Sequence, residues 1–151
     1  MRPTLIAGLG NAGFQDEAAG LYIVSQLEKN YSNFPFRLIS IGNDILNLIP
    51  LYQGEKKILF ISSGFMDCPA GEYCYLSVSE INDSIRIIGM NGIEIKTLFH
   101  EIPVLRQYDL KVLAFRIKWN EWGDELSPEV SKLMTIMIHD FWYLLERLNF
   151  A

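Results

Sequence analysis

Two adjacent carboxylates, Asp16 and Glu17, follow a glycine-rich segment near the beginning of the chain, and their type suggests chemistry. The segment is Gly8-Leu9-Gly10-Asn11, and Gly13 follows it. Carboxylates can hold a cation or a basic peptide, whereas the backbone amides of a glycine-rich turn can bind an anion. The same acids could also only cap a helix, because a carboxylate at a helix N-terminus gains about 0.3–1 kcal/mol from the helix dipole. The residues alone leave these three interpretations open.

The elements around these residues place them where α/β proteins form sites. Residues 4–7 are a short apolar run typical of a buried strand, and apolar residues recur at helical spacing over residues 20–27. We therefore predict a strand, a glycine turn and a helix that begins at Asp16 and Glu17. The carboxyl end of such a strand is where open α/β sheets place their binding sites.

The rest of the chain alternates between patterns typical of strands and of helices. Strands are predicted at residues 36–41, 57–61, 73–78 and 110–117, and helices at residues 42–49, 91–102 and 128–148; residues 84–92 fit either a strand or a loop. The strand at 73–78 follows the strand at 57–61 too closely for a parallel crossover, so we expect these two to pair antiparallel. The pattern predicts one domain over residues 1–151, a three-layer α/β/α sandwich with a mixed, mostly parallel sheet of about five strands, one of them antiparallel.

The composition argues against several classes of function. The net charge is −5 and the Lys and Arg residues are scattered, so we do not expect a nucleic-acid-binding surface. No apolar run approaches the roughly 20 residues of a membrane span and no secretory signal is recognisable, so we expect a cytoplasmic protein that does not enter a membrane. Cys68 and Cys74 have the spacing of neither a redox CxxC pair nor a zinc knuckle, so we expect reduced, structural thiols.

The glycines Gly8, Gly10 and Gly13 match the G-x-G-x-x-G fingerprint of dinucleotide-binding turns, with a strand before and a helix after them. Two carboxylates at the start of that helix would repel a pyrophosphate, and no acid ends the second predicted strand to hold a ribose hydroxyl. A small nucleotide- or anion-binding module is therefore an alternative and not the main hypothesis.

The order of these features resembles the hydrogenase maturation endopeptidases, which trim the large subunit of nickel–iron hydrogenases. The family opens with a strand, Gly-x-Gly-Asn, a few apolar residues, an acidic pair and a helix that begins with small residues. Here the motif reads Gly8-Leu9-Gly10-Asn11 and then Asp16-Glu17-Ala18-Ala19-Gly20. The turn Pro69-Ala70-Gly71, the helix from Asn91 and the segment Leu126-Ser127-Pro128 also resemble the family and occur in its order.

The resemblance implies a mechanism. Members of the family read nickel that is already inserted in the hydrogenase precursor, through three side chains at the carboxyl edge of the sheet, and then remove a short C-terminal peptide. The first of the three, an acid, corresponds to Glu17. The second, an aspartate, corresponds to Ser63, and the third, a histidine, corresponds to Asn91. The resemblance thus implies nickel supplied by the substrate precursor, with Glu17 as its ligand.

The substitutions at Ser63 and Asn91 leave the activity open. A hydroxyl or amide oxygen is a poorer nickel ligand than an imidazole. Asp67 and Glu94 are the nearby acids that could substitute, and Glu94 shares a helix face with Asn91. Two hypotheses follow: an endopeptidase that acts on a hydrogenase large-subunit precursor or a related protein, and a non-catalytic relative that binds such a precursor or another partner through the same cleft.

Two further groups of residues are candidates for binding. In both hypotheses the turn beside the metal ligand is expected to bind through Gly10, Asn11 and Asp16. Trp119 and Trp122 flank the loop WNEWGDE, and they could either pack on the core or form an exposed surface for a partner.

Overall fold

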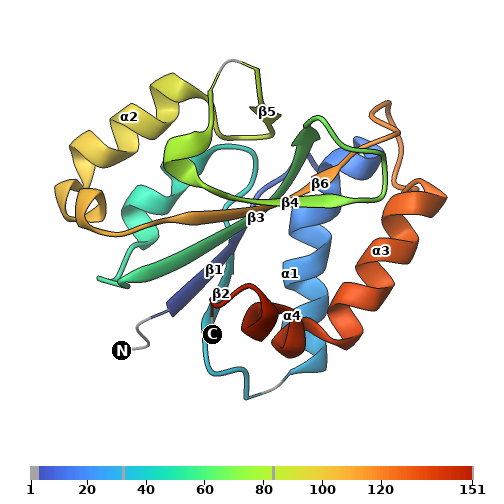
Figure 1. Cartoon of the computed structure of the whole chain (residues 1–151), viewed down its shortest axis with the longest axis horizontal. Helices are drawn as coiled ribbons and strands as arrows, with labels where there is room; N and C mark the ends of the chain where they lie inside the picture. Colours follow the sequence, from blue (N-terminus) through green and yellow to red (C-terminus); the bar gives the residue numbers. More distant parts are fainter. Residues whose placement is uncertain (1–3, 32, 83, 151) are drawn as a thin grey trace.

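The computed structural model describes residues 4–31, 33–82 and 84–150. Within them, six strands form one mixed sheet in the order β2-β1-β3-β6-β4, with β5 paired to the end of β3 (Figure 1). The strands are β1 (Thr4–Gly8), β2 (Arg37–Ser40), β3 (Lys57–Phe65), β4 (Tyr73–Ser77), β5 (Arg86–Ile87) and β6 (Lys111–Arg116). The α-helices are α1 (Ala19–Asn30), α2 (Gly92–Glu101), α3 (Pro128–His139) and α4 (Phe141–Arg147). Short 3₁₀ helices are η1 (Gln15–Ala18), η2 (Ile45–Leu51), η3 (Val78–Glu80) and η4 (Pro103–Gln107).

Parallel pairing dominates the sheet. β1 lies between β2 and β3 and is parallel to both, and β6 is parallel to β3 on its other side. β4 runs antiparallel to β6, and the two-residue β5 runs antiparallel to the end of β3. The predicted α/β class with a mixed, mostly parallel sheet is therefore confirmed, and β5 occupies the stretch whose pattern fitted either a strand or a loop.

The partner of β4 differs from the prediction. The short connection after β3 suggested that β4 would pair with β3, but β4 pairs with β6. Both edges of β3 are already hydrogen-bonded, to β1 on one side and to β6 on the other. Because β3 has no free edge over most of its length, β4 extends the sheet beyond β6 and forms its outer edge.

Helices cover both faces of the sheet, and Figure 1 shows α2 on the opposite face from α1, α3 and α4. Alternate side chains of β3 serve the two sides, as the pleat of a strand requires. Ile58 and Phe60 pack into a core with residues of η2 and α2, and Leu59 and Ile61 pack into a second core with residues of α1, α3 and α4. The predicted three layers are therefore helices, sheet and helices, and one apolar core lies on each face of the sheet.

Two helix boundaries differ from the predictions. The turn η1 contains Asp16 and Glu17, and α1 begins only at Ala19. The predicted last helix is interrupted at Asp140, whose backbone leaves the helical region (φ −117°, ψ 34°), so that α4 turns its apolar face onto the core. The helix predicted at residues 42–49 is the 3₁₀ helix η2, and the helix starts at Asn91 and Ser127 are confirmed. No helix in the described ranges is both long and apolar enough to cross a bilayer.

The two cysteines lie close together as free thiols. The Sγ atoms of Cys68 and Cys74 are 3.7 Å apart. Burial and the hydrogen bond to Cys74 raise the pKa of the Cys68 thiol to about 11. A thiol with such a pKa stays protonated near neutral pH and is a poor nucleophile, which agrees with the structural role predicted for this pair.

Candidate functional site

The backbone amides of the glycine turn after β1 are bonded to carbonyls of neighbouring segments. The amide of Leu9 donates to the Ile61 carbonyl (2.8 Å), and the amide of Gly10 donates to the Gly42 carbonyl (2.9 Å). The Asn11 amide donates to the Glu17 carbonyl (2.8 Å). These are the amides that would have to point at a phosphate, so the geometry argues against the alternative of a nucleotide- or anion-binding turn. Gly10 is needed here for close packing, since a Cβ on it would lie 2.5 Å from the carbonyl oxygen of Glu17.

Glu17 is half-buried beside this turn, and its carboxylate is fixed by Asn11. Its Oε1 accepts a hydrogen bond from Asn11 Nδ2 at 2.8 Å. Asn11 in turn lines a cleft of about 360 Å³ that also contains Asn91. The structure therefore brings three of the predicted site residues, Asn11, Glu17 and Asn91, to one edge of the sheet.

The lining of this cleft is made of amides and aliphatic side chains. The full lining is Asn11, Asn43, Ile81, Asn82, Ile85, Arg86, Ile87, Ile88, Gly89, Met90, Asn91 and Gly92. Arg86 is the charged residue of this set. We call this space the asparagine cleft. Its chemistry favours neutral hydrogen-bonding groups, apolar side chains and, through Arg86, an anionic group.

Asn91 and Glu94 are used to start helix α2. Asn91 Oδ1 accepts from the Glu94 amide at 2.9 Å, and Glu94 Oε2 accepts from the Asn91 amide at 3.5 Å. This is a reciprocal capping box, which satisfies amides that the first turn of a helix leaves without partners. The oxygen of Asn91 and the carboxylate of Glu94 are therefore already engaged at the positions where a metal ligand and its substitute were expected.

Ser63 lies inside the fold near the end of β3. It is fully buried, and its Oγ has no hydrogen-bond partner among the described residues. By strand alternation its side chain is on the face of Ile61, toward α1 and α3, whereas the Ser62 hydroxyl is on the opposite face and donates to the Ile88 carbonyl at 2.9 Å. Asp67 is exposed in the loop after β3 and does not line the asparagine cleft.

A resident metal site is not assembled by these side chains. Within residues 4–31, 33–82 and 84–150, no three His, Cys, Asp or Glu side chains gather closely enough to hold a metal ion. Glu17 is bonded to the side-chain amide of Asn11. At the positions of the other two expected ligands, Ser63 offers a buried hydroxyl and Asn91 caps a helix. The role of Glu17 as a ligand to a metal brought by a substrate stays a prediction.

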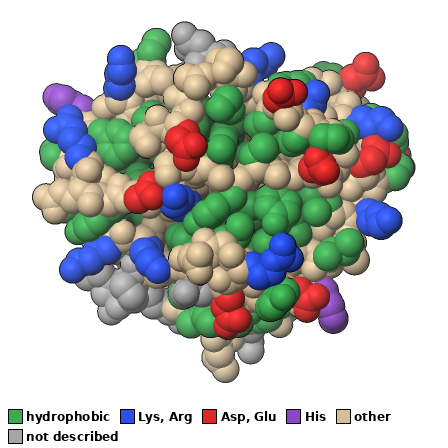
Figure 2. All heavy atoms as spheres, in the orientation of Figure 1, with side chains coloured by type: hydrophobic (Ala, Val, Ile, Leu, Met, Phe, Trp, Pro, Cys, Tyr) green, Lys and Arg blue, Asp and Glu red, His purple; other side chains and the backbone are tan. Residues whose placement is uncertain are grey.

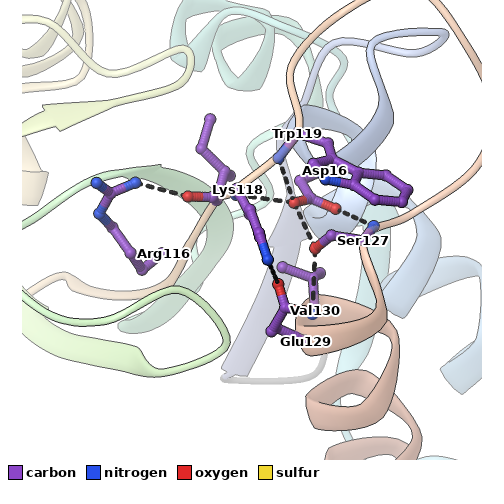
Figure 3. A network of polar contacts seen from close by, with 8 residues as sticks. Asp16, Arg116, Lys118, Trp119, Ser127, Glu129 and Val130 are labelled. Atoms are coloured by element: carbon purple, nitrogen blue, oxygen red, sulfur yellow. Dashed lines mark hydrogen bonds and ion pairs between the residues drawn. The ribbon is translucent and has the colours of Figure 1, made fainter.

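Asp16 has a different role from the two that were predicted for it. It is fully buried, and its carboxylate accepts four hydrogen bonds from the segment before α3 (Figure 3). Oδ2 accepts from the amides of Lys118 and Trp119, both at 2.9 Å, and from the Ser127 hydroxyl at 2.7 Å. Oδ1 accepts from the Ser127 amide at 2.7 Å. Asp16 therefore neither caps its own helix nor offers an oxygen to a ligand; it ties the glycine turn to the start of α3.

This network identifies residues that the sequence did not assign to the site. Ser127 was recognised as the N-cap of the last helix, and its Oγ does accept from the Val130 amide at 3.4 Å. Its second contact, with Asp16, joins residues 111 positions apart, and no local pattern signals it. The loop 118–127 is thereby held against the same turn that carries Glu17.

Trp122 and Trp119 also lie at this end of the molecule. Trp122 is 81% exposed, as expected for a surface that binds a partner, whereas Trp119 is half-buried and is partly packed against the protein. The Trp122 ring packs on Phe14, with ring centroids 4.5 Å apart. An exposed aromatic surface therefore stands beside the glycine turn.

Comparison with known proteins finds the same fold among hydrogenase maturation proteases. No family model matches the chain. Among solved structures, the [NiFe] hydrogenase maturation protease HybD from Thermococcus kodakarensis superimposes with a TM-score of 0.79 and 26% identity, over 95% of this chain and 99% of that one. The hydrogenase maturating endopeptidase HybD from E. coli superimposes with a TM-score of 0.73 over 97% and 93% of the two chains, and its 18% identity shows a shared fold.

One curated protein is similar to the chain in sequence. Protein FrxA from Pyrococcus furiosus is 25% identical over 123 residues, which is 78% of this chain and 86% of that protein. The shared fold extends over nearly the whole chain, and the glycine turn and acidic pair occur in it in the expected order. In fold and in the order of these motifs, the chain is similar to the hydrogenase maturation proteases.

Proposed function

We propose that this protein binds the C-terminal region of a nickel–iron hydrogenase large-subunit precursor, or of a related precursor, in the asparagine cleft, without the nickel-triggered cleavage implied by the family resemblance. The observation that carries the proposal is the state of the third ligand position. Asn91 is the N-cap of α2 and is satisfied by Glu94, so no imidazole or free carboxylate stands there.

The donor set argues against nickel-dependent chemistry. Nickel prefers imidazole and other nitrogen ligands, and neutral oxygens bind it weakly. Of the three positions that correspond to the family's metal ligands, only Glu17 carries a carboxylate. Ser63 is buried, and the side chain of Asn91 is engaged in capping α2. A metal held by one carboxylate would bind far more weakly than a metal held by two carboxylates and an imidazole, so a precursor would gain little affinity from its nickel.

The same lining suits a peptide. An asparagine side chain offers both a donor and an acceptor, as does each residue of an extended backbone. Asn11 and Asn43 line the cleft with aliphatic side chains around them, while the Asn82 carboxamide is already bonded to Glu80 and Ser84. Arg86 can pair with a carboxylate of the bound segment. We therefore expect recognition by hydrogen bonds and apolar contacts, with an affinity that does not depend on nickel.

A second function, retained proteolysis, is favoured by one observation. The Glu17 carboxylate is held in place by Asn11 Nδ2, as a ligand prepared for a metal would be. In that case the nickel would arrive in the precursor, Glu17 would contact it, and a C-terminal peptide would be released.

Mixing the protein with nickel-loaded and nickel-free precursor separates the two functions. We expect a complex of similar affinity with both precursors by calorimetry, and an unchanged precursor mass by mass spectrometry. Arg86→Gln should weaken the complex about tenfold if it pairs with a carboxylate. Asp67→Asn, which removes an exposed acid outside the cleft, is the matched control and should leave the affinity unchanged.

Two results would contradict this proposal. Loss of a C-terminal peptide that disappears in Glu17→Gln would establish the protease. Failure to bind either precursor would rule out precursor binding as the function of the cleft.

A further inference from the structure

Trp122 is a large aromatic side chain that the fold keeps exposed and in a fixed position. It is 81% exposed, yet its ring packs on Phe14 at 4.5 Å with an interplanar angle of 33°. The backbone beneath is paired as well, since Phe14 and Gly123 form an isolated parallel bridge. The Gly123 amide donates to the Gly13 carbonyl at 2.9 Å. The exposure of Trp122 is therefore built into the backbone and does not reflect a loose loop.

Gln15, next to Phe14, supports the same loop from a strained conformation. Its φ is 52°, in the left-handed region that residues other than glycine rarely adopt. Its amide donates to the Gly123 carbonyl at 3.0 Å, and its Oε1 accepts from the Glu121 amide at 3.2 Å. Such strain persists only where the surroundings enforce it, and it is enriched at binding sites. Asp16 holds the two ends of the loop, so the whole segment is preorganised.

The charge around Trp122 is acidic. Glu121, Asp124 and Glu125 are all exposed, and Glu121 and Glu125 line a cleft of about 450 Å³. The remaining lining residues of that cleft are Gln15, Lys118, Trp119 and Asn120. The Lys118 ammonium is paired with Glu129 at 2.9 Å, and Figure 3 shows this contact directed toward α3. Three carboxylates thus remain around the tryptophan without that cation to balance them.

The acidic charge and the exposed indole together favour a basic occupant. Figure 2 shows acidic side chains, with some basic ones, on the side of the molecule where Figure 1 places the loop between β6 and α3. A cation over the face of an indole is attracted by the ring quadrupole, and neighbouring carboxylates add to the attraction. A second copy of this chain is disfavoured as the occupant, because a twofold contact would bring the same carboxylates together and each copy carries a net charge of −5.

We propose that Phe14, Trp122, Glu121, Asp124 and Glu125, here called the tryptophan surface, bind a basic segment of a partner polypeptide, with an Arg or Lys side chain over the Trp122 indole. The surface is separate from the asparagine cleft, and the inference does not depend on the function proposed for that cleft. Asn11 lines the cleft and Phe14, three residues later, belongs to the tryptophan surface, so a partner seated in the cleft could reach this surface as well.

A short peptide of alternating Arg and Ser is the probe, with a peptide of alternating Glu and Ser as its counterpart. Titration calorimetry at low salt should show binding of the Arg peptide alone, and the affinity should fall as salt is added. Trp122→Ala and the double variant Glu121→Gln/Glu125→Gln should each weaken binding about tenfold, and Trp122→Phe should retain part of the affinity because it keeps an aromatic face.

Trp142 provides the matched control. It is also an exposed tryptophan beside a carboxylate, because its Nε1 donates to Glu146 at 2.8 Å, but it lies on α4. Trp142→Ala should leave the affinity unchanged, with circular dichroism confirming that every variant is folded. Equal binding of the Glu peptide, no binding of the Arg peptide, or an equal loss in Trp142→Ala would overturn the proposal. A dimer seen by sedimentation that Trp122→Ala abolishes would overturn it in favour of a second copy.

Discussion

Asp16 and Glu17 are neighbours in the chain, but the turn η1 sends their carboxylates to different surroundings. Asp16 is fully buried and accepts four hydrogen bonds, while Glu17 is half-buried and accepts one from Asn11. At the scale of single residues, the acidic pair therefore consists of one structural carboxylate and one that remains accessible to a ligand.

Replacing Asp16 by alanine should strongly destabilise the protein. The change would leave the two donors of Ser127 without an acceptor in a buried place, and the amides of Lys118 and Trp119 without one in a partly buried place. A fully buried donor left unpaired costs about 1–3 kcal/mol and a partly buried one costs less, so we expect a total loss of about 3–5 kcal/mol in the free energy of unfolding. Urea denaturation followed by circular dichroism measures this loss.

The control for this prediction is Asp67→Asn, which removes an exposed acid and should change the free energy of unfolding by less than about 0.5 kcal/mol. A loss in Asp16→Ala as small as in this control would show that the four contacts do not support the fold.

At the scale of secondary-structure elements, the start of α2 explains the identity of residue 91. Asn91→Ala removes the cap and should lower the free energy of unfolding by about 1 kcal/mol, whereas Asn91→Asp keeps the acceptor and should be nearly neutral. Thermal unfolding of both variants tests this. Asn120→Ala, at an exposed loop position, serves as the control. Equal stability of Asn91→Ala and the wild type would remove the capping explanation for this residue.

The approach of α1 to the sheet depends on a helical glycine. A Cβ on Gly20 would lie 2.2 Å from the carbonyl oxygens of both Leu9 and Ile61, so α1 could not keep its position. Gly20→Ala should therefore destabilise the protein by about 1–3 kcal/mol, although alanine is the better helix former.

Gly92 in the first turn of α2 is the matched comparison for Gly20. A Cβ there would meet nothing within 4 Å. Gly92→Ala should be neutral or should stabilise the protein by about 0.4–1 kcal/mol, through the entropy of the unfolded chain. In denaturant titrations Gly20→Ala should lower the free energy of unfolding, and Gly92→Ala should leave it unchanged or raise it. A shift in the same direction would mean that packing against the sheet does not decide the effect at Gly20.

At the scale of the whole molecule, an ion pair makes the global stability depend on pH. Glu55 is fully buried between η2 and β3, and Arg37 on the edge strand β2 donates to its Oε2. Burial alone would raise the pKa of Glu55, but the hydrogen bonds from Arg37 and from the Gln53 amide outweigh it, and the net effect lowers the pKa below its ordinary value.

The direction of the pH effect follows from this lowered pKa. The unfolded chain takes up the proton at a higher pH than the folded protein, so the stabilisation is complete above the ordinary carboxyl pKa and is lost as the pH falls through the lower folded value. We expect the free energy of unfolding to decrease from pH 7 toward acid by less in Glu55→Gln than in the wild type. Urea titrations at several pH values measure it, and an identical slope in the variant would contradict the assignment.

Much of the architecture could be predicted from the sequence because it is encoded locally. The apolar runs of β1, β3 and β6, the helical spacing in α1 and α3, and the Ser127-Pro128 start are patterns within one element. The glycine turn and the acidic pair likewise lie within 10 residues, from Gly8 to Glu17, which is why they indicated both the place of the site and the family. Periodicity and capping are properties of adjacent residues, so they can be read without the fold.

The tertiary structure alone decided which partners meet. It paired β4 with β6, because β3 had no free edge, and it divided the acidic pair between a buried contact 111 residues away and the accessible turn. It also engaged Asn91 and Glu94 in a cap and left Trp122 exposed on Phe14. These outcomes depend on burial and on contacts between distant segments, which no local pattern specifies. The sequence by itself determined the main strands, the helix starts, and the place of the glycine turn and the acidic pair, and the fold determined which of those residues remain free to act.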